Sequence, residues 1–153
     1  MGNALVVKHS GGMTSLHRAA QQVLAENRRV MLPHHPLGFG GGRYNFLAME
    51  LEARVGNRRV DCLVSGEGVI GTVYEKIKLA IEIRVTNPVD GDKLAELQEH
   101  GLNAVVEIDL RRFSKTEWNP ITLAFAVCDS SRDIKWLHSD RDEAFKKIYK
   151  ERE

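Results

Sequence analysis

The order strand, helix, strand over residues 77–110 constrains the fold more than any other feature of this chain. Residues 77–86 and 103–110 are apolar runs of strand length, and residues 91–100 between them are predicted to form a helix that Asp90 can cap. A helix that joins two strands in this way is typical of a right-handed crossover, which places the strands parallel and adjacent in one sheet. The chain is therefore expected to have an α/β fold.

The other segments predict a hairpin, further helices and loops. Residues 44–55 and 59–65 flank the turn pair Gly56-Asn57 and predict an antiparallel hairpin. The remaining expectations, in chain order, are a helix over 14–27, an extended piece at 30–33, loops at 34–42 and 66–71, a helix at 116–128, an extended piece at 134–137 and a helix from 139 onward. Together they predict a mixed central sheet, built from a hairpin plus a parallel crossover and flanked by helices on both faces.

Length and composition narrow the class of protein. With 153 residues and 42% apolar content, the chain is expected to form one domain over residues 13–153, preceded by a short arm at 1–12. The net charge of +1 gives no overall attraction to nucleic acid or to an anionic membrane. Cys62 and Cys128 lie in apolar runs without CxxC spacing, so buried free thiols are expected, with a disulfide between them as the alternative. No run has the length of a membrane span, and we expect a cytoplasmic protein without a membrane partner.

Two carboxylates, Asp61 and Glu82, stand inside apolar strand-like runs. Strand alternation puts each acid on the face opposite its apolar neighbours, and a carboxylate there costs free energy unless it is paired or binds a cation. Neighbouring strands could present both acids to Mg²⁺ or Mn²⁺, which take one or two carboxylates, a backbone carbonyl and waters. The alternatives are that Asp61 is a solvent-facing acid at a strand end and that Glu82 forms a surface ion pair with Arg84.

These acids belong to a set of motifs that resembles a known superfamily. The central motifs are Arg59-Val60-Asp61, residues 80–87, Asp90, Lys93, Gly101-Leu102 and residues 106–110. They resemble the nuclease domain of the PD-(D/E)XK superfamily, most closely its CoiA-like, competence-associated branch. Residues 14–20 and 30–33 are similar to that branch's first helix and following strand, and Trp136-Leu137 is similar to its closing strand. The resemblance implies a restriction-endonuclease-like fold and metal-dependent hydrolysis of nucleic acid, with DNA as the expected substrate and Mg²⁺ or Mn²⁺ as the cofactor.

The resemblance also implies roles for individual residues. Asp61 and Glu82 match the two metal-binding acids, and the carbonyl of Ile83 is expected to complete the protein's share of the ligands. Arg84 stands where the superfamily usually has a lysine. Arginine stays charged and can only position or stabilise a phosphate, whereas a lysine can also exchange a proton. Lys93 or Lys78 could take over that role, and Lys93 is favoured because it begins the helix directly after the metal-binding strand.

Four further residues are candidates for the same site. The resemblance implies that His17 faces the metal cluster or the scissile phosphate, although a packed histidine is the ordinary expectation on this helix. Gln21, one turn later, occupies a position where relatives often carry lysine. Glu107 and Asp109 repeat the acidic strand pattern and could add a metal ligand, or they could only line a polar face.

Two other interpretations remain open on the sequence alone. The presence of Arg84 at the lysine position favours a catalytically inactive member of the same fold that binds nucleic acid or a protein partner. An unrelated small α/β accessory subunit is the other interpretation, and it requires the motif match to be chance. Because the superfamily often dimerises, a homodimer is a further expectation.

Overall fold

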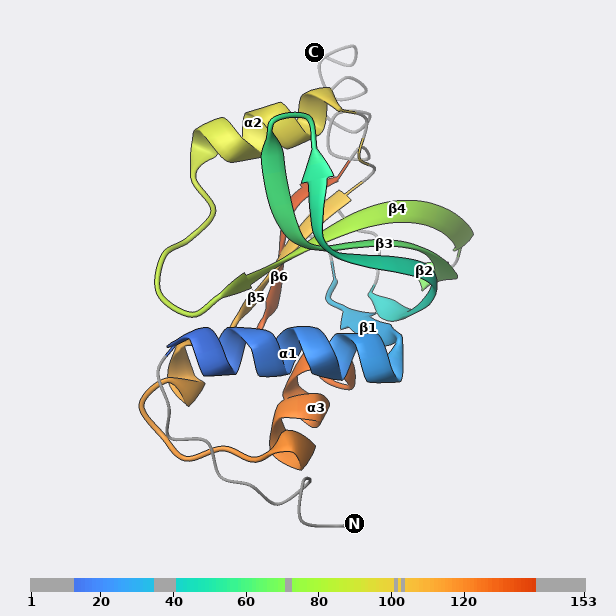
Figure 1. The fold of residues 1–153 in the computed structure, drawn as a ribbon. Helices are drawn as coiled ribbons and strands as arrows, with labels where there is room; N and C mark the ends of the chain where they lie inside the picture. Colours follow the sequence, from blue (N-terminus) through green and yellow to red (C-terminus); the bar gives the residue numbers. More distant parts are fainter. Residues whose placement is uncertain (1–12, 35–40, 71–72, 101, 103, 140–153) are drawn as a thin grey trace, which may run out of the picture.

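The computed structural model describes residues 13–34, 41–70, 73–100, 102 and 104–139, and in them the chain folds as an α/β domain with a curled six-stranded sheet and three α-helices (Figure 1). The elements in chain order are α1 (Met13–Asn27), β1 (Arg29–Leu32), β2 (Gly42–Val55), β3 (Arg58–Ile70), β4 (Val73–Arg84), α2 (Gly91–Glu99), β5 (Ala104–Asp109), the 3-10 turn η2 (Arg111–Phe113), α3 (Pro120–Cys128) and β6 (Ile134–Ser139). None of these helices is long and apolar enough to cross a membrane.

The sheet is mixed, with strand order β1-β2-β3-β4-β5-β6. Strands β4 and β5 are parallel and are joined through α2, and the other neighbours are antiparallel. The predicted hairpin is β2–β3, with Val55 paired to Arg58 across the Gly56-Asn57 turn. Both the crossover and the hairpin expected from the sequence are therefore confirmed.

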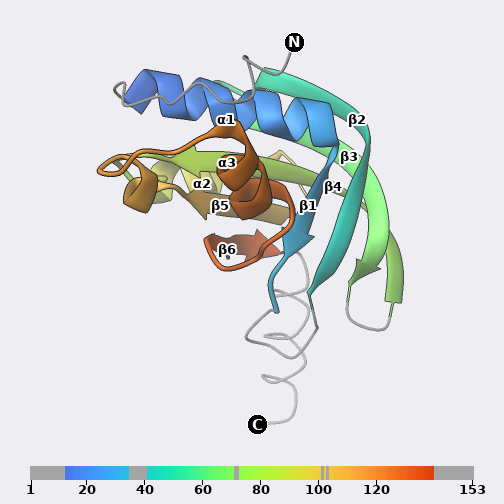
Figure 2. The same ribbon diagram turned by 90° about the horizontal axis from the view of Figure 1, so that it is seen from below.

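Helices cover both faces of the sheet, as predicted. Helix α1 buries residues at helical spacing against one face, where it also packs on α3 (Figure 2). Helix α2 lies on the opposite face, where Leu97 is buried in a second, smaller apolar cluster with Ala80 and Val105 (Figure 1). The main cluster under α1 and α3 includes Leu16, Ala20, Val23, Leu24, Cys62, Val64, Ile81, Ile83, Val106, Ile108, Leu123 and Val127.

The predicted loop at residues 66–71 is wrong over residues 66–70, because β3 continues to Ile70. The glycines that suggested a turn instead permit a close approach to β2. A Cβ atom on Gly66 would lie 2.1 Å from the carbonyl oxygen of Asn45, and one on Gly68 would lie 2.3 Å from that of Arg43. Glycine inside a strand often marks such a contact. Strand β4 likewise begins at Val73, earlier than the predicted residue 77.

Several predicted boundaries also change. Helix α3 begins at Pro120 and not at residue 116, because Asn119 and Thr122 form a capping box at its start. Asp90 caps α2 as predicted. Cys62 and Cys128 are buried and free. The arm at 1–12, residues 35–40 of the predicted loop and the C-terminal helix beyond Ser139 lie outside the described residues, and Ser139 itself ends β6.

Candidate metal centre

The candidate site lies where strands β3 and β4 stop pairing. Cys62 and Ile81 are the last paired residues at this end. Asp61 directly precedes Cys62 in the chain, and Glu82 directly follows Ile81. Beyond the ladder, the backbone amide of Ile83 donates a hydrogen bond of 2.7 Å to Oδ2 of Asp61. The carboxylate of Asp61 thus takes the place of a strand acceptor, which fixes its orientation at the point where the strands separate.

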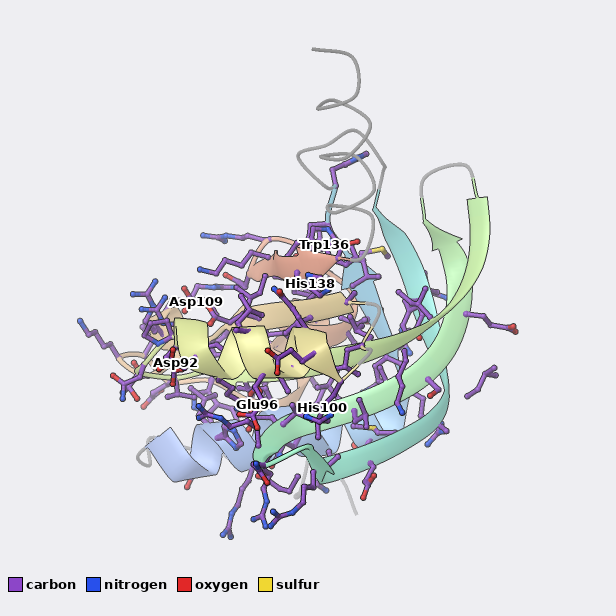
Figure 3. The ribbon with its side chains drawn as sticks, turned by 90° about the horizontal axis from the view of Figure 1, so that it is seen from above. Asp92, Glu96, His100, Asp109, Trp136 and His138 are labelled. Carbon is purple, nitrogen blue, oxygen red and sulfur yellow. The ribbon has the colours of Figure 1, made fainter. Side chains whose placement is uncertain are left out.

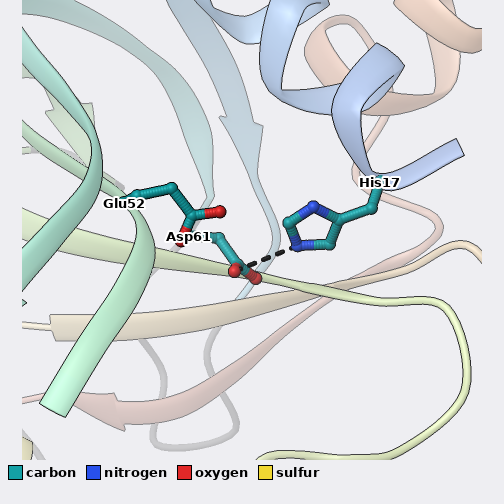
Figure 4. A group of neighbouring side chains, drawn as sticks. All are labelled: His17, Glu52 and Asp61. Carbon is teal, nitrogen blue, oxygen red and sulfur yellow. Dashed lines mark ion pairs between the residues drawn. The ribbon is translucent and has the colours of Figure 1, made fainter. Parts of the chain in front are cut away.

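Helix α1 reaches this point with two polar side chains one turn apart. Nε2 of His17 lies 3.0 Å from Oδ1 of Asp61 (Figure 4). The amide of Gln21 donates to the backbone carbonyl of Asp61 at 3.0 Å and to Oε1 of Glu52 at 3.2 Å. The hydrogen bond with Asp61 raises the pKa of His17, although burial acts against the shift. The predicted proximity of His17 and Gln21 to Asp61 is therefore found in the structure.

Glu52, which the sequence motifs do not identify, completes a group of three possible metal ligands. One ligand atom from each of His17, Glu52 and Asp61 lies within 4.8 Å of the other two (Figure 4). Glu52 also has a φ of 50°, in the left-handed region, which costs a residue with a Cβ on the order of 1 kcal/mol. Two carboxylates and an imidazole could together hold a metal ion.

A signal for Glu52 was present in the predicted hairpin. Asp61 lies four residues after the Gly56-Asn57 turn and Glu52 lies four residues before it, so a two-residue turn places them opposite each other. The observed pairing of Leu51 with Cys62 and of Ala53 with Val60 has this register. Glu50 and Glu52 are both exposed and lie two residues apart on β2. Strand alternation alone could therefore not distinguish them.

Glu82 meets a cation from the opposite face of the sheet. It is 4% exposed, and Nζ of Lys93 in the first turn of α2 lies 2.7 Å from its Oε1. Within the described residues this oxygen accepts no hydrogen bond of good geometry, so Lys93 acts as a charge partner and not as a well-aligned donor. Lys93 therefore lies beside Glu82, and the catalytic role expected for it stays a prediction.

The two central carboxyl groups have opposite pKa shifts. Burial, together with the nearby charge of Asp61, raises the pKa of Glu82 to about 8, against the opposing effect of Lys93. Burial also acts to raise the pKa of Asp61, but hydrogen bonds with His17, Glu82 and Ile83 outweigh it and the pKa is lowered. A divalent cation bound near these two groups would reduce the repulsion between their carboxylates.

Cavities open on both sides of this pair. One, of about 400 Å³, is lined by His17, Gln21, Glu52 and Ile83 together with Arg18, Val85, Thr86 and Asn87. The other, of about 200 Å³, is lined by Glu82, Ile83, Arg84, Asn87, Pro88, Val89, Asp90, Lys93 and Glu107. Ile83 and Asn87 line both cavities, Glu52 lines the first and Glu82 lines the second.

The remaining candidates are not part of the three-ligand group. Nη1 of Arg84 lies 3.9 Å from Oε1 of Glu107, and Nε of Arg84 donates to the carbonyl of Thr86 at 3.5 Å. Asp109 binds the guanidinium of Arg111, which holds the pKa of Asp109 at about 2. Lys78 is exposed at a position opposite Ser65 on β3.

The predicted ligand role of the Ile83 carbonyl stays a prediction, because the contact shown for Ile83 is made by its amide. No known family model, curated protein or solved structure matches this chain.

Proposed function

We propose that this protein is a metal-dependent nuclease of the PD-(D/E)XK type, with a restriction-endonuclease-like fold, that hydrolyses phosphodiester bonds in DNA. The observation that carries the proposal is the group of possible ligand atoms from His17, Glu52 and Asp61 at the point where β3 and β4 separate, next to the buried Glu82–Lys93 pair. Carboxylates are the ligands that hard divalent cations such as Mg²⁺ prefer in proteins.

The residues present fit Mg²⁺ or Mn²⁺. Asp61 and Glu82 would hold the ion, and Glu52 and His17 offer further ligand atoms within 4.8 Å of Asp61. When bound, such an ion lowers the pKa of a coordinated water and stabilises negative charge on a phosphate. Gln21 holds Glu52 against the backbone of Asp61, so the ligands are oriented by the protein alone.

Lys93 fits the part that a lysine plays in such a site. Its ammonium group lies beside Glu82 and lines the 200 Å³ cavity, where it can stabilise charge on a phosphate or orient a water. Arg84 lines the same cavity but lies toward Glu107. We therefore assign the main positive charge at the reacting phosphate to Lys93, and to Arg84 a contribution to substrate binding.

A second candidate function is a catalytically inactive module that binds nucleic acid or a protein partner. The observation that favours it is that His17 and Lys93 already serve as charge partners of Asp61 and Glu82. Either cation would have to move if the carboxylates were to take up an ion. Weak or absent metal binding would support this alternative.

A cleavage assay with matched variants separates the two functions. Plasmid DNA, linear DNA and RNA are incubated with Mg²⁺, with Mn²⁺ or with EDTA, using the wild type, Asp61→Asn and Glu82→Gln. Glu50→Gln is the control, because Glu50 is an exposed acid on the same strand as Glu52. We expect cleavage by the wild type and Glu50→Gln only, and only with metal.

Two results would overturn the enzyme proposal: no cleavage of any nucleic acid by the wild type, or cleavage that survives both site substitutions. Calorimetric titration with Mn²⁺ is the parallel measurement. We expect binding to the wild type and at least tenfold weaker binding to Asp61→Asn, about the effect of removing one charged ligand.

A further inference from the structure

Glu107 is a fully buried carboxylate that the proposed chemistry does not use. It lies on β5 directly opposite Glu82 of the parallel strand β4, and its side chain is 1% exposed. Burying a carboxylate costs several kcal/mol unless partners compensate for the loss of water. Glu107 therefore needs hydrogen-bond donors or cations that stabilise its buried carboxylate.

The two oxygens of Glu107 have different partners. Oε2 accepts a hydrogen bond of 3.2 Å from the backbone amide of Val89, in the segment that leads from β4 into α2. Oε1 accepts no hydrogen bond from the described residues, and it lies 3.4 Å from Nζ of Lys135 and 3.9 Å from Nη1 of Arg84. The directional contact of Glu107 is thus made with Val89, and the two cations compensate its charge.

Val89 is followed by the residues that place Lys93. Asp90 caps α2, because its Oδ1 accepts from the amide of Lys93 at 2.7 Å and its carbonyl accepts from the amide of Leu94 at 3.1 Å. Lys93 then reaches back across the cavity to Glu82. The lining of the 200 Å³ cavity includes Glu82, Lys93, Asp90, Val89 and Glu107. Figure 3 shows the side of the sheet that α2 covers, with α2 in front.

We infer that Glu107 is a positioning residue for Lys93. By holding the amide of Val89, its carboxylate fixes the start of α2 and so keeps the Lys93 ammonium beside Glu82. The contacts that Glu107 makes are with an amide and two cations, and its expected role as a metal ligand stays a prediction. The consequence for catalysis rests on the proposed nuclease function, whereas the placement of Lys93 does not.

The test measures the chemical reactivity of Lys93, which does not depend on nuclease activity. The metal-free protein is labelled briefly with acetic anhydride, and the extent of acetylation at Lys93 relative to the exposed Lys115 is read by mass spectrometry. Glu107→Ala removes both the acceptor and the charge. Glu107→Gln keeps an oxygen that can accept from Val89 and removes only the charge. Asp109→Ala, two residues further along β5, is the matched control.

We expect relative acetylation of Lys93 to rise about fivefold in Glu107→Ala, the change that follows from losing one hydrogen bond of ordinary strength. It should stay within about twofold of the wild type in Glu107→Gln and in Asp109→Ala, since both keep an acceptor for Val89. Val89→Pro removes the amide hydrogen, at the cost of fixing φ at this position, and should increase Lys93 labelling as Glu107→Ala does. Because it leaves the carboxylate in place, it also decides the case if Glu107→Ala does not fold.

Unchanged Lys93 labelling in both Glu107→Ala and Val89→Pro would overturn the inference. So would an equal increase in Glu107→Gln, because the charge and not the hydrogen bond would then hold the segment. In the cleavage assay, Glu107→Gln should retain most of the activity that Glu107→Ala loses. If the wild type cleaves no nucleic acid, the nuclease proposal fails, and the labelling still decides the role of Glu107.

Discussion

The amide of Ile83 donates to the carboxylate of Asp61 at 2.7 Å, immediately beyond the last residues that pair β3 with β4. A side chain therefore continues the hydrogen bonding of the sheet after the backbone has stopped. Because Asp61 also accepts from His17, its two oxygens connect β4 to α1. Asp61 thus has a structural task in addition to any role as a ligand.

Substitution of Asp61 should expose the amide of Ile83. In Asp61→Ala we expect hydrogen exchange of that amide to accelerate by more than about tenfold, because a hydrogen bond to a charged acceptor contributes about 1.5–3 kcal/mol. Asp61→Asn retains an acceptor oxygen and should give a smaller change. NMR exchange rates in the metal-free protein are the measurement. Equal acceleration in both variants would show that the charge of Asp61, and not its acceptor oxygen, protects the amide.

The metal-free protein should lose stability as pH rises from about 5 to 8. Burial raises the pKa of Glu82 to about 8 from an ordinary value of 4.5, so over this range the folded chain keeps a proton that the unfolded chain has released. The raised pKa of His17 acts in the same direction, since its stabilisation is complete below 6.5 and is lost above its folded-state pKa. The lowered pKa of Asp61 matters only near and below 3.8, where stability falls as the pH falls.

Urea unfolding with EDTA at pH 5, 6, 7 and 8 tests this dependence. Glu82→Gln has no proton to release at this position and should show a flatter profile. A wild-type free energy of unfolding that stays constant or increases over this range would contradict the raised pKa of Glu82.

Alanine at Gly66 should destabilise the fold because the added methyl group would meet the Asn45 carbonyl at 2.1 Å. We expect a loss of about 1–3 kcal/mol, the usual cost of forcing extra volume into a packed position. Gly91→Ala is the matched control, because a Cβ there has no neighbour within 4 Å and alanine favours a helix. Thermal and urea unfolding of the two variants provide the comparison. A loss as large in Gly91→Ala would show that the close approach of β2 is not the cause.

Removal of the positive charge at Lys93 should impair catalysis more than its removal at Arg84. If the proposed function holds, Lys93→Met is expected to lower kcat by about 10²-fold, as for other groups that stabilise or protonate a transition state. Arg84→Met should chiefly raise KM, by less than about tenfold, as expected for the loss of one phosphate contact. Steady-state cleavage of a short duplex with Mg²⁺ provides both constants, and Arg111→Met is the control. A larger loss of kcat in Arg84→Met would reverse the assignment.

The sequence predicts those parts of the fold that depend on local patterns. The crossover through α2 and the hairpin around Gly56-Asn57 follow from apolar periodicity and turn chemistry, and both are present. Their geometry in turn brings Asp61 and Glu82 together. Gly66 and Gly68 misled the prediction, because a glycine needed for close contact between strands has the same local signature as a glycine in a turn.

The rest of the candidate site depends on contacts between distant segments. Glu52 could be found only by counting the register of the hairpin, since its own surroundings in the sequence match those of Glu50. The partners of Glu107 come from β4, β6 and the segment before α2, and no periodicity encodes such a combination. Acidic strand patterns therefore identify candidates, and packing decides which of them become ligands and which become supports.

His17 and Lys93 come from helices on opposite faces of the sheet, yet they meet neighbouring carboxyl groups. In a partly folded chain with only one helix docked, either Asp61 would lack His17 or Glu82 would lack Lys93. The complete cluster thus requires both helices to be docked on the sheet. A cation that binds only the complete cluster would therefore stabilise the state in which both helices are docked, and would oppose partial unfolding of either one.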